Sequence, residues 1–483
     1  MLPSTANRDS RPSFSPSPSF WPRVREFAVP APMIETATAR REAGDWAGAC
    51  AAAGVDVDLR LRSVARSHGR ELAARIRADL RHLAPDLLRW HMPRIAPHGL
   101  LRPGLTIDLA RYEPPERDGP GPLHLVARTP PAWADAGQRI SLALWDGSHT
   151  EPTARRHPHP HPNRRFRLDL HRHLWDARRI HELRLRSGAD DRSTGHADPA
   201  VDPDLWGAVP PDLRCAVGRW AVEAATLLRA EGLGQGGTVS VRLGGRRRLL
   251  LRVEGDEDAP GTPAARIAAV LPDPGSSTAP VLPDAATWVL PDLDLLRTGA
   301  IDAGQLHPLV ARALVPGLPS ASAPTRSRAG DGAGATRLVE CRGARHRIGL
   351  VEGALAPLDH DPAEIRREEL LVALTGTPLP CLRAIDEAHR RPDCLTGVRE
   401  RLDHGDIAGA LAVVEGLLGP EAVLRDGPLR DELEAAARRR ITYGLFRADL
   451  LGPGPIRRRS DPRRPVDPRP RRARRPRHTT TVS

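Results

Sequence analysis

The stretch TVSVRLGGRRRLLLRVEG, residues 238–255, decides the fold class of this chain. Apolar and polar residues alternate on both sides of Gly244-Gly245, as they do in two half-buried strands joined by a tight turn. We therefore predict a β-hairpin over residues 238–254. The residues before it, from about Pro211 to Glu231, carry apolar side chains at helical spacing, which predicts a helix directly upstream. The chain is thus expected to combine helices with antiparallel strands.

The same alternation recurs towards the N-terminus. The segments LTIDLARY, LHLVART, RISLALWD and RRFRLDLHRHLW predict an antiparallel β-module at residues 99–185, with its strands between about Gly104 and Trp175. Apolar residues at helical spacing from Ile34 to about Arg94 predict a helical segment over residues 33–98. Residues 1–32 are rich in Pro and Ser and are expected to be disordered.

Towards the C-terminus the pattern becomes helical again. Residues 255–285 are expected to be a loop within an α+β region at 186–318, in which HPLVARAL, from His307, starts a helix. Residues 319–335 (PSASAPTRSRAGDGAGA) are the predicted linker. Residues 336–451 are expected to hold a short hairpin followed by helices from Asp361 to about Leu450, and 452–483 a disordered tail. The predicted fold class is α+β, with a helical N-terminal segment, an antiparallel β-rich middle, a helical C-terminal bundle and disordered termini.

Charge is concentrated in the predicted tail. The stretch from Arg457 to His478 contains eleven Arg and two Asp and carries +9, so the rest of the chain carries only +3 of the total of +12. This distribution argues against a uniformly basic nucleic-acid-binding domain. It predicts nonspecific, salt-dependent contact of the tail with polyanions, through Arg457, Arg458, Arg459, Arg471, Arg472, Arg474 and Arg475. All 72 basic residues are Arg, which indicates codon bias in a GC-rich genome and weakens a functional interpretation of any one of them.

The cysteines and the hydropathy pattern indicate a compartment. The five cysteines form no CxxC pair, which favours buried free thiols in a reducing cytoplasm. No apolar run approaches the roughly 18 residues of a spanning helix, so we predict a soluble cytoplasmic protein without a membrane span. The N-terminus lacks the apolar core of a secretory signal, and translation from Met1 or from Met33 stays open.

A histidine-rich stretch, RRHPHPHPNRRFRLDLHRHLWD (155–176), raises the question of a metal site. Alternating prolines favour polyproline II for HPHPHP, in which successive histidines point in different directions and do not converge on one ion. In a strand, by contrast, Asp169, His171 and His173 would share one face, which is a sensible beginning for a transition-metal site. The alternative interpretation, which period-two alternation usually indicates, is a solvated face opposite a buried one.

Motifs of the common catalytic classes are absent from the sequence. It contains no GxSxG elbow, no Walker A motif, no HExxH and no GxGxxG that opens a helix. GLGQGG (232–237) leads into a predicted strand, so it lacks the helix N-terminus of a phosphate site and is expected to be a loop. No catalytic residue and no cofactor is predicted from these patterns.

A repeated skeleton, GDxAGA, occurs in AGDWAGACAAA (43–53) and HGDIAGALAVV (404–414). Gly-Asp can end one helix and begin the next, while a small Ala lets the two helices pack closely. Each copy resembles the inter-helix turn of tetratricopeptide-type repeats, with Trp46 or Ile407 at the large apolar position and Ala49 or Ala410 at the small one. No adjacent tandem copy follows, so two isolated helical hairpins are predicted; chance similarity in an Ala/Gly-rich chain is the alternative.

Two further stretches, RRFRLDLHRHLWDARR and RRITYGLFRADLLGPGP, resemble parts of uncharacterised actinobacterial proteins that accompany AAA+ ATPase and von Willebrand A modules. The resemblance implies an accessory role in an ATP-driven assembly, with an AAA+ ATPase or a von Willebrand A protein as partner. The first hypothesis is therefore a non-enzymatic cytoplasmic adaptor. The alternatives are a nucleic-acid-associated protein that acts through its Arg-rich tail, and a metal-dependent enzyme built on Asp169, His171 and His173.

Overall fold

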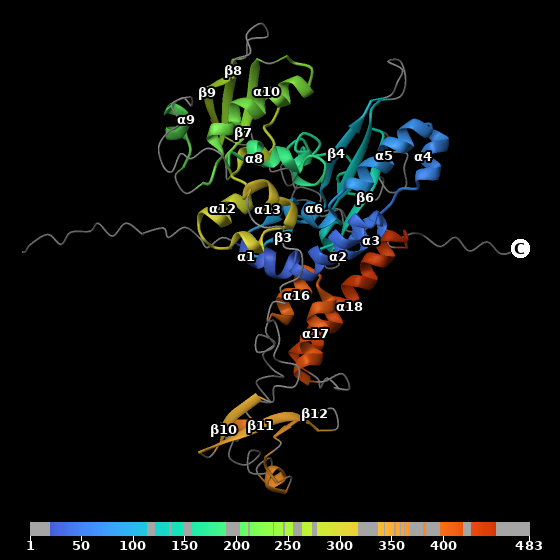
Figure 1. Cartoon of the computed structure of the whole chain (residues 1–483), viewed down its shortest axis with the longest axis vertical. Coiled ribbons are helices and arrows are strands. Elements are labelled where there is room, and N and C mark those ends of the chain that lie inside the picture. The colour runs from blue at the N-terminus through green and yellow to red at the C-terminus, as the bar shows by residue number, and fades with distance from the viewer. Residues whose placement is uncertain are drawn as a thin grey trace, which may run out of the picture.

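A computed structural model shows an α+β protein of several packed units (Figure 1). It describes residues 20–113, 121–134, 138–147, 157–189, 203–210, 213–234, 236–244, 247–254, 263–272, 278–316, 337–341, 343–351, 354–357, 359–361, 363–367, 380–382, 397–418 and 427–450. The expected linker at 319–335, the Arg-rich tail and the first 19 residues lie outside these ranges.

The helical segment predicted at residues 33–98 is confirmed for most of its length, with one short strand inserted in it. Helices already begin at Trp21, so the disorder expected for residues 1–32 is wrong for residues 20–32, whose Val24, Ala28 and Val29 are buried in the first core. Its helices are α1 (Trp21–Arg23), the π-helix η1 (Val24–Ala28), α2 (Ala31–Glu42), α3 (Trp46–Ala52), α4 (Leu61–Ser67), α5 (Arg70–His82) and α6 (Pro85–His91). Strand β1 (Val55–Val57) separates α3 from α4. On α5 the buried residues Ala73, Ile76 and Leu80 recur at helical spacing, so one face of the helix joins the core.

The predicted β-module contains a four-stranded sheet of order β1-β6-β5-β4. Its antiparallel strands are β4 (Thr106–Tyr112), β5 (Leu123–Arg128) and β6 (Ile140–Trp145), and a two-stranded ribbon of β2 (Arg94–Ile95) and β3 (Leu100–Leu101) precedes them. Strand β1 pairs in parallel with β6, which brings the N-terminal helices onto the sheet edge. The fourth expected strand, RRFRLDLHRHLW, is not a strand but a series of turns, described below.

The first hydrophobic core includes residues well beyond the predicted helical segment at 33–98 and the predicted β-module at 99–185. It contains residues of the N-terminal helices and the four-stranded sheet, together with Leu293, Leu295, Leu309, Val310 and Leu314. These last residues belong to α12 (Pro291–Arg297) and α13 (Pro308–Leu314). The helix expected from His307 is therefore confirmed, but the α+β region predicted at 186–318 is divided, because its last helices pack with the N-terminal part.

The hairpin predicted at 238–254 is confirmed. Strand β7 (Gly237–Arg242) pairs antiparallel with β8 (Arg247–Glu254). The expected loop at 255–285 is wrong in part, because β9 (Ala264–Pro272) pairs with β8 and completes a three-stranded sheet. The predicted helix at 211–231 is shorter than expected: α10 spans Trp220–Ala230 and packs on this sheet in a second hydrophobic core.

The C-terminal part contains a small sheet and a helical bundle. Strands β10 (Arg337–Cys341) and β11 (Ala344–Val351) form the expected hairpin, and β12 (Ala354–Pro357) adds a third strand. The bundle comprises α16 (Val398–His404), α17 (Ile407–Leu418) and α18 (Pro428–Arg447), which share a core of their own. Figure 1 shows this bundle against the side of the molecule formed by α1, α2 and α3.

Candidate functional site

The strand face predicted for Asp169, His171 and His173 does not form. After Arg167 the chain runs through successive turns into a short 3₁₀ helix (Arg172–Leu174). The His171 N–H donates to the Leu168 carbonyl at 3.1 Å and the Leu174 N–H to the His171 carbonyl at 3.0 Å, so these residues do not alternate between two faces. The strand prediction was wrong because the period-two pattern is also satisfied by turns whose apolar side chains reach the core.

Asp169 and His171 have local partners. Both oxygens of Asp169 accept hydrogen bonds from Arg167 at 2.8 Å. His171 lies with Nδ1 2.9 Å from the Arg167 carbonyl and Nε2 3.2 Å from Glu223 of α10. Burial and the neighbouring His171 hold the pKa of His173 well below its usual range. In the part of the chain that the structure describes, these three side chains do not form a group with converging ligand atoms.

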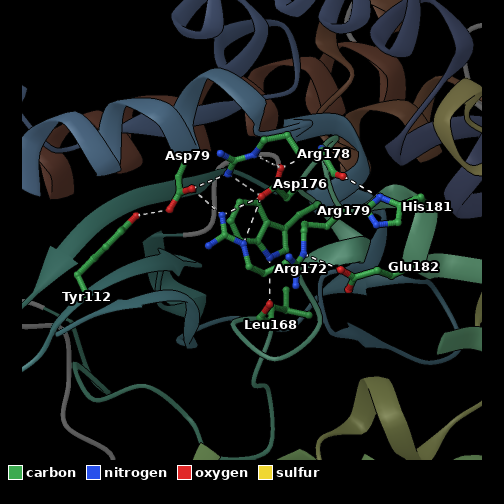
Figure 2. A network of polar contacts seen from close by, with 10 residues as sticks. Asp79, Tyr112, Leu168, Arg172, Asp176, Arg178, Arg179, His181 and Glu182 are labelled. Atoms are coloured by element: carbon green, nitrogen blue, oxygen red, sulfur yellow. Dashed lines mark hydrogen bonds and ion pairs between the residues drawn. The ribbon is translucent and has the colours of Figure 1, made fainter. Parts of the chain in front are cut away.

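A network of carboxylates and guanidinium groups fastens the same turns to helix α5 (Figure 2). The Asp79 carboxylate of α5 accepts hydrogen bonds from Tyr112 at 2.7 Å and from Arg172 and Arg178 at 2.6 Å each. Asp176 accepts from the same two arginines at 2.8 Å. Because all these groups are paired with one another, we interpret the network as structural.

Two carboxylate–imidazole pairs lie inside the first core. His124 Nδ1 lies 2.6 Å from Asp108, where burial raises the pKa of the carboxyl to about 6. His307 Nε2 lies 2.8 Å from Asp86, and its Nδ1 accepts from the Leu309 N–H at 3.1 Å. A general base needs one imidazole nitrogen available to a nucleophile. Both nitrogens of His307 are used within the fold, so this pair caps α13 and links it to α6.

A cleft of about 350 Å³ lies where α18 meets the edge of the four-stranded sheet. Tyr443 and Arg447 of α18 form one side, and Asp58, Arg128 and His157 contribute charged or polar groups. The remaining lining residues are Val57, Leu59, Arg60, Thr129, Pro130, Ser141 and Phe446. His157 is the one histidine of HPHPHP in this lining; burial lowers its pKa to about 4.

The polar groups at this cleft join the C-terminal helix to β1. Tyr443 donates to Asp56 at 2.6 Å, Arg139 binds the same carboxylate at 2.5 Å, and Arg447 pairs with Asp58. Burial would raise the pKa of Asp56, but the bonds from Arg139 and Tyr443 outweigh it and lower the pKa below its ordinary value. The contacts therefore connect α18 to β1 and to Asp58 just after it.

Both GDxAGA segments form helix–turn–helix units, as predicted. Gly44 and Gly405 adopt φ values of +77° and +84° after α2 and α16, a conformation that glycine accepts without strain. The following Asp45 and Asp406 cap α3 and α17 by accepting from the N–H three residues on, at 2.8 and 2.9 Å.

The second glycine and the last alanine of GDxAGA also have a structural reason. A Cβ atom at Gly48 would lie 2.1 Å from the Asp45 carboxylate, and one at Gly409 would lie 2.2 Å from that of Asp406. The final alanines, Ala49 and Ala410, are fully buried between helices. The two units are therefore built alike, although one lies at each end of the described chain.

One guanidinium group anchors both units. Arg89 of α6 is 2% exposed and donates to three main-chain carbonyls. Its Nε reaches Ala28 at 2.9 Å, its Nη2 reaches His404 at 3.0 Å, and its Nη1 reaches Gln138. Ala28 ends η1 just before α2, and His404 ends α16 just before the second turn. Arg89 therefore fixes the entry to one hairpin and the turn of the other.

Neighbouring contacts reinforce this junction. Arg23 forms an ion pair with Glu400, and the Phe27 ring stacks on His404 with 6.3 Å between centroids. Gly397, which precedes α16, packs so closely on Phe27 that a Cβ atom there would lie 2.8 Å from the ring. Among the described residues, this is a junction that sequence reasoning missed, because its members are separated by hundreds of positions.

The sequence pattern also did not reveal a group formed by Cys341, His360 and Cys381. Their ligand atoms all lie within 4.8 Å of one another. The two cysteines are free thiols, and burial together with the adjacent Cys341 sulfur raises the pKa of Cys381 to about 11. Wide spacing along the chain hid this group, because it matches no short metal-binding motif.

Comparison with protein-family models, with curated proteins and with solved structures finds no match to this chain. In the described ranges, no helix is both long and apolar enough to cross a membrane.

Proposed function

We propose that this protein is a non-enzymatic adaptor of the cytoplasm, an accessory subunit of a multi-protein assembly. One observation carries the proposal: two helical hairpins of like construction, one from each end of the described chain, meet at one junction, where the buried guanidinium of Arg89 binds the Ala28 carbonyl just before the first hairpin and the His404 carbonyl at the turn of the second. Helical hairpins offer faces and grooves to protein partners. The chain uses several hydrogen bonds and ion pairs to hold them there.

The surface of α17 supports this proposal. Glu415 is the one charged residue of this helix, so apolar side chains occupy more than the face that packs in the bundle. Ala408 and Ala412 are exposed, and Leu411 is 42% exposed. A contiguous exposed apolar surface on a helix is typical of a protein-interaction site.

The partner that we propose is an AAA+ ATPase or a von Willebrand A protein of the assembly, and the ATPase is the one tested below. The resemblance of RRFRLDLHRHLWDARR and RRITYGLFRADLLGPGP to proteins that accompany such modules supports this choice, and the chain itself has no ATPase motif. A reducing location agrees with the four described cysteines, Cys50, Cys215, Cys341 and Cys381, which are free and buried.

Affinity capture from nuclease-treated extract of the native host tests the proposal. Four forms are compared: the full chain, a chain ending at Gly454, Leu411→Asp, and the control Leu233→Asp, which alters a leucine that is 55% exposed elsewhere. We expect a stoichiometric ATPase partner with the full chain, the truncated chain and Leu233→Asp, and its loss with Leu411→Asp. Recovery of nucleic-acid-binding proteins with the full chain alone would contradict the adaptor and favour the Arg-rich tail. Recovery of no stoichiometric protein by any form would also contradict it.

A further inference from the structure

The group of Cys341, His360 and Cys381 brings together three segments of the chain, one of them a strand of the small C-terminal sheet. Cys341 is the last residue of β10, His360 follows β12, and Cys381 lies in the described segment 380–382. Both cysteines are 0% exposed, and the His360 side chain is 4% exposed. Two sulfur atoms and one imidazole nitrogen within 4.8 Å of one another are spaced as ligands around one ion.

The two ring nitrogens of His360 have different surroundings. Its Nδ1 lies 3.7 Å from a carboxylate oxygen of Glu364, one turn further along the chain. Its Nε2 is buried and has no hydrogen-bond partner in the described part of the chain. Metal-bound histidines are commonly arranged in this way, with one nitrogen on the metal and the other directed towards a carboxylate that orients the ring.

The described side chains of this sheet form a small apolar cluster. Strands β10, β11 and β12 contain five, eight and four residues. Among residues of this unit whose side chains are described, the apolar cluster consists of Cys341 and Cys381, with Val339 and Leu382 packed against them. A metal ion or a disulfide is a common means of stabilising a small sheet.

We propose that Cys341, His360 and Cys381 bind a zinc ion, and that this ion holds the β10–β12 sheet together. Zinc favours thiolate and imidazole ligands in a tetrahedral arrangement. Binding releases the two thiol protons, and the two thiolates then balance the charge of Zn²⁺, so a neutral centre is buried. Three ligands come from these side chains, and the fourth position is available to water or another donor. A Cys341–Cys381 disulfide is the competing chemistry.

Metal analysis of the full chain tests this proposal. The protein is expressed with zinc in the medium and purified without a polyhistidine tag, because the chain has its own histidine-rich stretch. We expect about one zinc ion per chain, and a fall of roughly tenfold or more in Cys341→Ala and Cys381→Ala, since each removes a direct ligand. Cys215→Ala, which alters a buried free thiol of another core, and His171→Ala are matched controls that should keep the metal.

A second measurement covers the case in which the cysteine variants do not fold. The wild-type protein is stripped by a chelator and reloaded with Co²⁺, whose near-ultraviolet charge-transfer absorption requires thiolate ligands. Hydrogen exchange is followed in residues 337–357, where chelation should accelerate exchange and cobalt should restore protection. The proposal is overturned by a protein that carries no zinc and gives no thiolate–cobalt absorption, by a Cys341–Cys381 disulfide in the purified chain, or by zinc that Cys381→Ala retains and His171→Ala loses.

Discussion

Replacement of Arg89 by Met removes the donor that fastens both helical hairpins. Met has a similar length and no polar group, so the variant tests the hydrogen bonds more than the packing. Three buried carbonyl oxygens, those of Ala28, Gln138 and His404, then lose their guanidinium partner. An unsatisfied buried acceptor costs about 1–3 kcal/mol. Because the buried charge is removed as well, we expect a net loss of roughly 3–5 kcal/mol.

Arg89→Lys should lower the stability by more than half as much as Arg89→Met does. A single ammonium group does not reproduce the planar fork with which the guanidinium reaches three carbonyls in different directions. Arg81→Met is the matched control, because Arg81 is exposed on the preceding helix. Its effect should stay within about 0.5 kcal/mol, as for most surface substitutions.

The assay combines urea denaturation with hydrogen exchange, because a chain with several separate cores need not unfold in one step. Exchange should accelerate in residues 24–28 and 398–418 of Arg89→Met, while protection in β8 should stay as in the wild type. An unchanged urea midpoint together with unchanged protection of η1 and α16 would contradict this prediction and show that other contacts hold the hairpins.

Three other perturbations test local features. Asp79→Ala removes the acceptor of three hydrogen bonds in the network of Figure 2 and should cost roughly 3–5 kcal/mol; a loss below about 1 kcal/mol in urea denaturation would be inconsistent with a structural network. Burial would raise the pKa of Asp176, but hydrogen bonds from Arg178 and Arg172 outweigh this effect and lower the pKa below its ordinary value. The ionised carboxylate therefore stabilises the fold above the unfolded pKa of about 3.9, and this stabilisation is lost as pH falls through the folded pKa. The stability difference between wild type and Asp176→Asn should therefore shrink below about pH 4, and a difference independent of pH would contradict this. Gly397→Ala should lower the free energy of unfolding by about 1–3 kcal/mol in the same assay, because both the φ of +71° and the Phe27 ring oppose a Cβ atom. The control Gly147→Ala, which also has a positive φ but open space around it, should lower it by about 1 kcal/mol. Equal losses in the two variants would exclude a role for the Phe27 contact.

Features carried by contiguous residues could be predicted from the sequence. The GDxAGA turns depend on a glycine with positive φ and a capping aspartate beside it, and all the required atoms lie within six residues. The hairpin at 238–254 likewise depends on local alternation and on the turn at Gly244. The α+β fold class followed from counting such local patterns.

Features that depend on distant partners could not be predicted. Whether Asp169 and His171 face solvent or a core depends on Arg167 and on Glu223 of α10, and the alternating pattern of the segment is the same in either case. Strand β9 was missed because its flanking Pro, Gly and Asp residues resemble a loop, while its pairing with β8 decides its conformation. The prediction of polyanion contacts for Arg457, Arg458 and the other tail arginines lies outside the described residues.

Hydrogen exchange of the full chain, with and without its captured ATPase partner, tests the adaptor proposal most directly. We expect partner binding to slow exchange in the two hairpins, at residues 31–53 and 398–418, and to leave the sheet of β7, β8 and β9 unchanged. Slowing confined to that sheet, or confined to the tail beyond Gly454, would contradict the account, because the surface held by Arg89 would then have no part in binding.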